Sequence, residues 1–215
     1  MNNVEVREYQ TTEGKAPLTE WLASLRDGAT RARITARLDR LKAGLLGDWK
    51  NVGGGVCELR IDHGPGYRVY YGQMGKTLIL CYVVVIRAHK RRISRQPMRT
   101  GKTTKPASPS RPFIAAEHLR SEAEVAAYIE AMLEDGDARA VPVALRTVVD
   151  AVGGMTALAD KTGLSRETLY RTLSERGNPR LDTLAVILAA FGLRLTVQPA
   201  LKTRARRSEP RPALV

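Results

Sequence analysis

A basic, proline-containing stretch between two nearly neutral blocks constrains the fold of this chain most strongly. Residues 87–112 hold nine lysines and arginines, four prolines and no acidic residue. Residues 1–86 carry a net charge of +3 and residues 113–201 a net charge of −3, whereas the tail 202–215 carries +4. A stretch of this composition resists forming a packed core. We therefore predict two domains, 1–86 and 113–201, joined by a linker at 87–112 and followed by a disordered tail.

The overall charge and the cysteine content limit the class of protein. The net charge of +13 and a pI near 10.2 favour a polyanionic partner, usually nucleic acid. The linker could bind nucleic acid without sequence preference or serve only as a solubilising spacer. No run approaches the roughly 20 apolar residues of a membrane span, and the N-terminus lacks a signal-peptide core. With Cys57 and Cys81 alone and no metal-ligand spacing, we expect no disulfide framework, metal or cofactor, no membrane partner and a cytoplasmic location.

Hydrophobic periodicity predicts an α+β fold for the first block, an antiparallel sheet with two helices on one face. Three runs alternate apolar and polar residues, as half-buried strands do, and a fourth is rich in strand-forming residues. In the second predicted helix, Ile34, Leu38 and Leu41 share one stripe, which we expect to face the sheet. The predicted strands are 4–9, 55–63, 67–73 and 77–86, and the predicted helices are 17–28 and 29–44.

Charged and phenolic side chains lie on or beside these strands. Since residues two apart share a face of a strand, Glu58 and Arg60 lie together, as do Arg68 and Tyr70 on the next strand. RNA cleavage by the 2′-hydroxyl needs a base, an acid and cations near the developing phosphorane. Arginines and Lys50 on a rigid sheet can supply that charge. The alternative interpretation is a solvent-exposed face with cross-strand Arg–Glu pairs and no chemistry.

Four strings in this block carry a family resemblance. They are W-L-x-x-L-R-D at 21–27, R-A-R-I-x-A-R-L-x-R-L at 31–41, G-D-x-K at 47–50 and G-V-x-E-L-R-I-x-x-G-P-G-Y-R-V-Y-Y at 55–71. Together they resemble the phage-derived HigB branch of the RelE superfamily of toxins, over nearly all of residues 3–80. The resemblance implies a RelE-like fold and a small ribonuclease that cleaves mRNA on the ribosome.

The same resemblance implies roles for particular side chains. It assigns catalysis to four residues on or beside the sheet: Arg60, Arg68, Lys50 and Tyr71. It assigns RNA contact to two arginines on one stripe of the second helix, Arg33 and Arg37. No metal takes part.

The chain departs from this family after Leu80. The family's last strand continues with a string close to L-L-L-C-G-G-D-K-S-T-Q, whereas residues 81–94 are C-Y-V-V-V-I-R-A-H-K-R-R-I-S. One DNA sequence can encode both strings in two reading frames. If suitable codons are chosen for residues 81–94, the same bases read from the third base of the Cys81 codon encode L-C-G-G-D-K-S-T-Q-A-T-D-I. We infer a frameshift in an ancestral toxin gene, which replaces a Gly-Gly-Asp-Lys turn by stiff valines and predicts weak or absent nuclease activity. The alternative is a naturally divergent basic tail.

The second block has the periodicity of an all-helical domain followed by a short strand that could pair with another copy. Ser121 and Glu124 form a capping-box pattern at the start of its first helix. The predicted elements after that helix are a second helix at 138–153, a helix-turn-helix pattern at 155–174, a last helix at 181–192 and a terminal strand at 193–198.

The helix-turn-helix pattern rests on its turn, its cap and its core spacing. Gly163 suits the turn, and Ser165 caps the second helix. Leu169 and Leu173 form the buried pair of that helix. Groups on its outward face can bind base edges and phosphates. The predicted DNA-binding residues are Ser165, Arg166, Thr168, Arg171 and, beyond the helix, Asn178. The alternative is a plain helical hairpin with a surface ion pair between Glu167 and Arg171.

A second resemblance rests on four strings of this block. They are A-A-E-x-L at 115–119, A-A-Y-I-E-A-M-L-E-D-G-D at 126–137, T-G-L-S-R-E-T-L-Y-R-x-L-S-x-x-G-N-P at 162–179 and an end string with L-A-A-F-G-L-R-L at 188–195. They are similar to HigA-type antidote proteins, which are XRE-like helix-turn-helix antitoxins, over about 112–198. The resemblance implies a contact with the toxin in cis or in trans, operator DNA as a partner, and repression of its own operon. Palindromic operators further imply a homodimer.

Two functional hypotheses follow from these resemblances. The first is a toxin–antitoxin fusion whose second half is a sequence-specific DNA-binding autorepressor and whose toxin half is inactivated. The alternative is an active bifunctional chain, a ribosome-dependent mRNA endoribonuclease held in check by its own antitoxin domain. A decaying gene product without an active role is the third interpretation.

Overall fold

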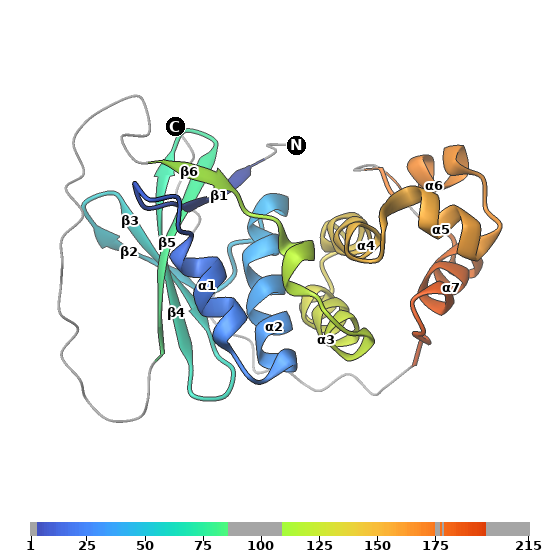
Figure 1. The fold of residues 1–215 in the computed structure, drawn as a ribbon, viewed down its shortest axis with the longest axis horizontal. Coiled ribbons are helices and arrows are strands. Elements are labelled where there is room, and N and C mark those ends of the chain that lie inside the picture. Colours follow the sequence, from blue (N-terminus) through green and yellow to red (C-terminus); the bar gives the residue numbers. More distant parts are fainter. Residues whose placement is uncertain (1–3, 86–108, 175–176, 178, 197–215) are drawn as a thin grey trace.

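The computed structural model describes residues 4–85, 109–174, 177 and 179–196, and of 81–85 it describes the backbone alone. The described chain is mixed α+β, with a sheet in the N-terminal region (residues 4–85) and helices in the C-terminal region (residues 109–196). Figure 1 shows the sheet at one end of the molecule and the last helices at the other. The predicted class of fold is confirmed at this level.

The sheet has six strands in the order β2-β3-β4-β5-β1-β6. Their bounds are β1 (Glu5–Tyr9), β2 (Trp49–Gly53), β3 (Val56–Ile61), β4 (Tyr67–Met74), β5 (Thr77–Val85) and β6 (Ser110–Pro112). The prediction of an antiparallel sheet is wrong for one pair, because β1 runs parallel to β5, with Glu5 opposite Thr77. After the β3–β4 hairpin, β5 enters between β4 and β1 and runs in the same direction as β1.

Two strands of the sheet were not predicted. β2 pairs antiparallel with β3 at one edge, although its exposed residues do not alternate with buried ones. β6 lies within the last three residues of the predicted linker and pairs antiparallel with β1, with Glu8 opposite Arg111. The linker interpretation therefore does not extend to Ser110–Pro112. The physical reason is that the edge of β1 offers unpaired backbone donors and acceptors that a following segment can satisfy.

Helices α1 (Pro17–Ser24) and α2 (Gly28–Asp39) cover one face of the sheet. The short 3₁₀ helix η1 (Arg40–Ala43) continues α2 and ends at Gly44, whose left-handed backbone (φ 70°) suits glycine. Ile34, Leu38 and Leu41 are fully buried beneath these helices, as their stripe predicted.

The C-terminal region contains the 3₁₀ helix η2 (Ala115–His118) and five helices: α3 (Glu122–Leu133), α4 (Ala140–Ala151), α5 (Gly154–Thr162), α6 (Arg166–Thr172) and α7 (Leu181–Ala190). Ser121 caps α3 as predicted, accepting the Glu124 N–H at 3.3 Å. No described helix is by itself long and apolar enough to cross a membrane; α4 and α5 pass that test only as a pair bent by 92°.

Residues 193–196 of the predicted terminal strand at 193–198 are not in a strand within this single chain, and its pairing with another copy stays a prediction; residues 197 and 198 lie outside the described part. A strand requires a hydrogen-bonded neighbour, and both edges of the sheet lie on the far side of α2 from this segment.

Helix α2 is packed on two sides. Its inner face lies on the sheet, and its outer face lies against α3 and, to a smaller extent, α4 (Figure 1). Ala32 and Ala36, both fully buried, belong to the core of the C-terminal helices. Conversely, Phe113 and Ala115 are buried in the core of the sheet. Each region therefore supplies residues to the core of the other.

Candidate functional site

The predicted catalytic cations lie on the face of the sheet opposite to α1 and α2. Lys50, Glu58 and Tyr70 are in register across β2, β3 and β4, so their side chains share that face. Arg60 lies opposite Arg68 in the same ladder. No described helix packs on these side chains, since the helices cover the face that carries the apolar residues. The structure thus brings Lys50, Arg60 and Arg68 to one face, with Lys50 exposed at its edge.

The Glu58 carboxylate is the centre of this group, which we call the sheet-face cluster (Glu58, Arg60, Arg68 and Tyr70). Its Oε1 accepts a hydrogen bond from Arg60 Nε at 2.9 Å and lies 3.5 Å from Arg68 Nε. Its Oε2 accepts a hydrogen bond from the Tyr70 hydroxyl at 2.8 Å. Burial alone would raise the pKa of the Glu58 carboxyl, but the hydrogen bonds from Arg60 and Tyr70 outweigh burial and lower that pKa below its usual value.

Tyr71 does not belong to this cluster, which corrects its assignment as a catalytic residue. Its side chain is 1% exposed and points into the core under the helices. Burial raises the pKa of the Tyr71 hydroxyl, and the neighbouring Cys57 raises it further. Tyr70 points to the opposite face, because neighbouring residues of a strand point to opposite faces, but it is itself only 8% exposed. The alternation of apolar and polar residues at 67–70 was the signal that could have distinguished the two tyrosines.

The two arginines with a predicted RNA contact are engaged inside the chain. Arg33 forms an ion pair with Glu130 of α3 at 3.0 Å. Arg37 donates to the Leu46 carbonyl at 2.8 Å, and a side chain at Gly47 would collide with its guanidinium. In this conformation Arg33 would have to leave Glu130 before it could meet RNA.

A buried ion pair joins α2 to α3. Arg31 Nη2 lies 2.5 Å from Glu124 Oε1, with side-chain exposures of 7% and 9%. The other oxygen of Glu124 accepts the Arg120 N–H at 3.1 Å. Gly28, the first residue of α2, makes room for this carboxylate, because a Cβ there would lie 2.6 Å from Glu124 Oε1. The carboxylate thus sits at the N-terminal end of α2, where negative charge is favoured.

A second buried carboxylate connects three elements. Asp39 at the end of α2 is fully buried and accepts hydrogen bonds from the Tyr128 hydroxyl of α3 at 2.5 Å and from Thr147 Oγ1 of α4 at 2.6 Å. Lys42 Nζ lies 2.6 Å from the other oxygen. Burial, together with Asp39, raises the pKa of Tyr128 well above its usual value. A carboxylate buried at this depth needs such partners, because they offset the cost of removing it from water.

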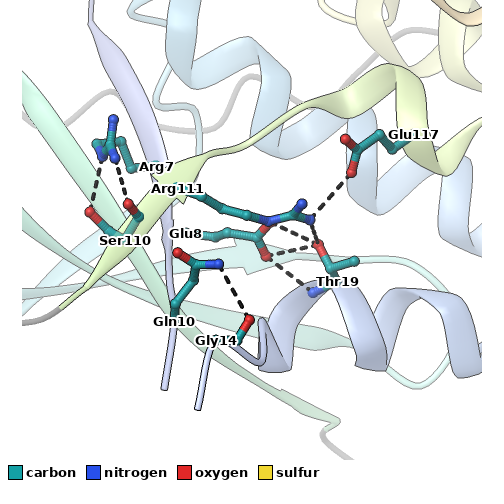
Figure 2. Close-up of polar contacts among 8 residues, drawn as sticks. All are labelled: Arg7, Glu8, Gln10, Gly14, Thr19, Ser110, Arg111 and Glu117. Carbon is teal, nitrogen blue, oxygen red and sulfur yellow. Dashed lines mark hydrogen bonds and ion pairs between the residues drawn. The ribbon is translucent and has the colours of Figure 1, made fainter. Parts of the chain in front are cut away.

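A third contact fastens β6 to the sheet (Figure 2). The Glu8 carboxylate is fully buried and accepts hydrogen bonds from Thr19 and from Arg111 Nε, the latter at 2.6 Å. Arg111 also donates to Thr19 Oγ1 at 2.9 Å and pairs with Glu117 at 3.3 Å. Sequence reasoning missed this contact and both carboxylates above, because Arg111 lay in the predicted linker and Glu124 was interpreted as a capping residue alone.

His118 is a buried histidine at the same junction and makes stability dependent on pH. It is 2% exposed, stacks on Phe113 and has no hydrogen-bond partner for Nε2 among the described residues. Burial, followed by the charges of Arg111 and Arg120, lowers its pKa from 6.5 to about 4.

We expect the free energy of unfolding to fall as the pH drops from 6.5 to 4, because the unfolded chain takes up a proton that the folded chain excludes. The effect reaches about 3 kcal/mol from a shift of this size. Urea unfolding at a series of pH values tests this for the wild type and His118→Gln. The expected result is a shallower loss in the variant; parallel curves for the two proteins would contradict it.

The predicted helix-turn-helix segment corresponds to α5, a turn and α6. Gly163 ends α5 with a left-handed backbone (φ 69°), and Ser165 Oγ accepts the Thr168 N–H at 3.2 Å as the cap of α6. Leu169 and Leu173 are fully buried, as their spacing predicted. The turn, the cap and the core of this segment are therefore those that the sequence indicated.

The outer face of α6 carries the predicted DNA-binding side chains. Ser165, Arg166 and Arg171 are exposed, and Thr168 is half-buried. Within the described residues neither arginine makes an ion pair, so the alternative pair between Glu167 and Arg171 is not formed. Asn178 lies outside the described residues. Two further groups were not predicted: Tyr170 is 58% exposed on α6, and Leu181 is 72% exposed at the start of α7.

Comparison with known proteins finds a family match for the helical part of the chain. Residues 110–199 match the model of a family described as probable addiction module antidote protein. A protein of Haemophilus influenzae strain Rd, described as uncharacterized, is 43% identical over 72 residues, which is 33% of this chain and 73% of the relative. Another uncharacterized protein of that strain is 36% identical over 86 residues, or 40% of this chain and 88% of the relative. No solved structure matches the chain.

These matches define first a class and then a family. The chain is a mixed α+β protein whose function is related to toxin–antitoxin systems. Its C-terminal region, residues 110–199, matches the probable addiction module antidote family. A toxin is the kind of partner that such an antidote implies.

Proposed function

We propose that this chain is a toxin–antitoxin fusion. Its C-terminal region is a HigA-type antidote and DNA-binding autorepressor of the cytoplasm, and its N-terminal region is a RelE-like toxin impaired by the altered segment at 81–94. The observation that carries this proposal is the exchange of core residues between the two regions. Phe113 fills the core of the sheet, and Ala32 and Ala36 fill the core of the helices. An antidote that binds a toxin tightly needs an interface of this kind, resembling a divided domain core.

The polar contacts support the same proposal. The Arg31–Glu124 pair, Asp39 with its hydroxyl donors, and Glu8 with Arg111 each cross from one region to the other. All three carboxylates are buried, which is tolerated only when the partner is present. The antidote region would therefore hold the toxin region in cis, and the same surfaces could bind in trans between two copies.

The exposed face of α6 supports DNA binding. A short capped helix with two exposed arginines, which make no ion pair within the described residues, suits the major groove, where arginine can bind guanine bidentately. Helices α5–α7 lie away from the sheet, on the far side of α4 (Figure 1), so the toxin region does not cover α6. We propose a homodimer, in which the exposed Leu181 and Val186 of α7 are buried, since two recognition helices match the half-sites of an operator.

Binding to the DNA upstream of its own gene tests the proposed repressor. We expect the purified chain to bind this fragment at least about tenfold more tightly than a scrambled fragment at physiological salt. Fluorescence anisotropy at several salt concentrations separates the sequence-specific part from the contribution of the basic residues, which falls steeply with salt. Equal affinity for the two fragments at every salt concentration would overturn the DNA-binding proposal.

The second candidate function is a live mRNA endoribonuclease. It is favoured by the open position of Arg60 and Arg68, which the described antidote helices leave uncovered on the other side of the sheet. Incubating the chain with translating ribosomes tests this function. Cleavage of mRNA that disappears in Arg68→Gln would establish the nuclease, whereas an intact message would support the impaired toxin.

A further inference from the structure

The sheet-face cluster contains its own anion. Two guanidinium groups converge on one oxygen of Glu58, at 2.9 Å from Arg60 Nε and 3.5 Å from Arg68 Nε. A second carboxylate, Asp48, lies 3.8 Å from Arg60 Nη1. The charges of these two arginines are therefore offset by two acidic groups, and Lys50 is left as the excess positive charge of the predicted site.

The exposure of these groups shows which of them a ligand meets first. The side chain of Glu58 is 14% exposed, whereas those of Arg60 and Arg68 are 35% and 25% exposed. The carboxylate thus lies deeper than the guanidinium groups that surround it. The Tyr70 hydroxyl fixes it from the far side with a 2.8 Å hydrogen bond, so the carboxylate is held in one orientation.

A guanidinium group binds carboxylates and phosphates through the same planar N–H donors. A phosphodiester that approaches Arg60 and Arg68 therefore competes with Glu58 for those donors. We infer that Glu58 acts as an internal competitor, which occupies the phosphate-binding position of Arg60 and Arg68 and sets the affinity of this face for the RNA backbone. This inference rests on the proposed RNA-binding role of the face.

The competing explanation is that Glu58 is a cross-strand partner that only stabilises the sheet. The two explanations predict different effects of Glu58→Gln on RNA affinity, since this variant keeps the size of the side chain and removes its charge. If Glu58 competes with RNA, the variant binds RNA more tightly. If Glu58 only stabilises, the variant loses stability and its affinity stays the same.

The experiment measures binding of a ten-nucleotide oligouridylate to the full chain and three variants. Glu58→Gln is expected to raise affinity about three- to tenfold, a gain on the scale of one ordinary hydrogen bond. Arg68→Gln is expected to lower it. The control Glu5→Gln removes the same charge from the sheet at an exposed ion pair with Arg7 and is expected to leave affinity within about twofold.

The outcomes separate this inference from the proposed function. Unchanged affinity in Glu58→Gln with a loss in Arg68→Gln overturns the competitor role and leaves the RNA-binding face in place. No change in either variant overturns both. Should Glu58→Gln fail to fold, titration of the wild type with inorganic phosphate decides the matter by NMR. The Nε–H signals of Arg60 and Arg68 are expected to move together; if they stay fixed while phosphate is bound elsewhere, the inference is wrong.

Discussion

Replacing Glu124 with alanine is expected to lower the free energy of unfolding of the whole chain by about 3–5 kcal/mol. The change leaves the Arg31 guanidinium buried without its carboxylate, with the Leu25 carbonyl as its remaining acceptor among the described residues. It also removes the acceptor of the Arg120 N–H and the negative charge at the N-terminal end of α2. Urea denaturation of wild type and variant measures the difference.

Glu130→Ala is the matched control for this prediction. Glu130 lies on the same helix and pairs with an arginine of α2, but its side chain is 70% exposed. Exposed pairs contribute roughly 0–1 kcal/mol, so its removal should change stability little. Equal losses in the two variants would show that burial at Glu124 does not matter and would contradict the interface described above.

Removing both arginines from the outer face of α6 is expected to have the second large effect. Arg166→Ala combined with Arg171→Ala should weaken binding to the operator by roughly 10²–10⁴-fold, at about 1–3 kcal/mol for each bidentate contact. Stability should stay within about 0.5 kcal/mol, because both side chains are exposed and make no ion pair within the described residues. Anisotropy titrations with operator and scrambled DNA measure the effect.

Arg146→Ala is the control for lost positive charge. Arg146 is exposed on α4, away from α6, and its removal should weaken binding to both DNA fragments alike and only slightly. A double variant of α6 that still distinguishes operator from scrambled DNA would show that another surface provides the specificity.

Elements with strong local signals could be predicted from the sequence. The stripe of Ile34, Leu38 and Leu41 predicted which side of α2 and η1 faces the sheet. The Ser165 cap, followed by the buried pair Leu169 and Leu173, predicted α6. Both signals are local, because helical periodicity and capping depend only on neighbouring residues. Strand β2 has exposed residues on both faces and hence no alternation. Strand β6 forms because the edge of β1 has unpaired backbone groups to which it can hydrogen-bond. Its three residues are too few to show an alternation that would predict a strand.

The interface between the regions could not be predicted for a related reason. Arg33 of α2 and Arg40 of η1 share one stripe of the predicted helix at 29–44, and such a stripe suits RNA as well as it suits protein. In the structure Arg33 pairs with Glu130, and Arg40 donates to the Met132 carbonyl at 2.9 Å and pairs with Asp135. The partners are about ninety residues away along the chain, and single-sequence patterns do not report contacts of that separation. Glu130 of α3 and Asp135, which follows α3, complement these arginines only once the two segments are packed.

Cutting the linker in the folded protein tests most directly whether the C-terminal region is an antidote that binds the N-terminal region. A recognition sequence for a site-specific protease, inserted after Gly101, leaves the described residues of both regions intact. We expect the two pieces to co-elute in gel filtration at the mass of the uncut chain, because Phe113, Arg111 and Glu124 hold them together. Separate elution of the pieces, or loss of one piece as aggregate, would contradict the proposed pairing.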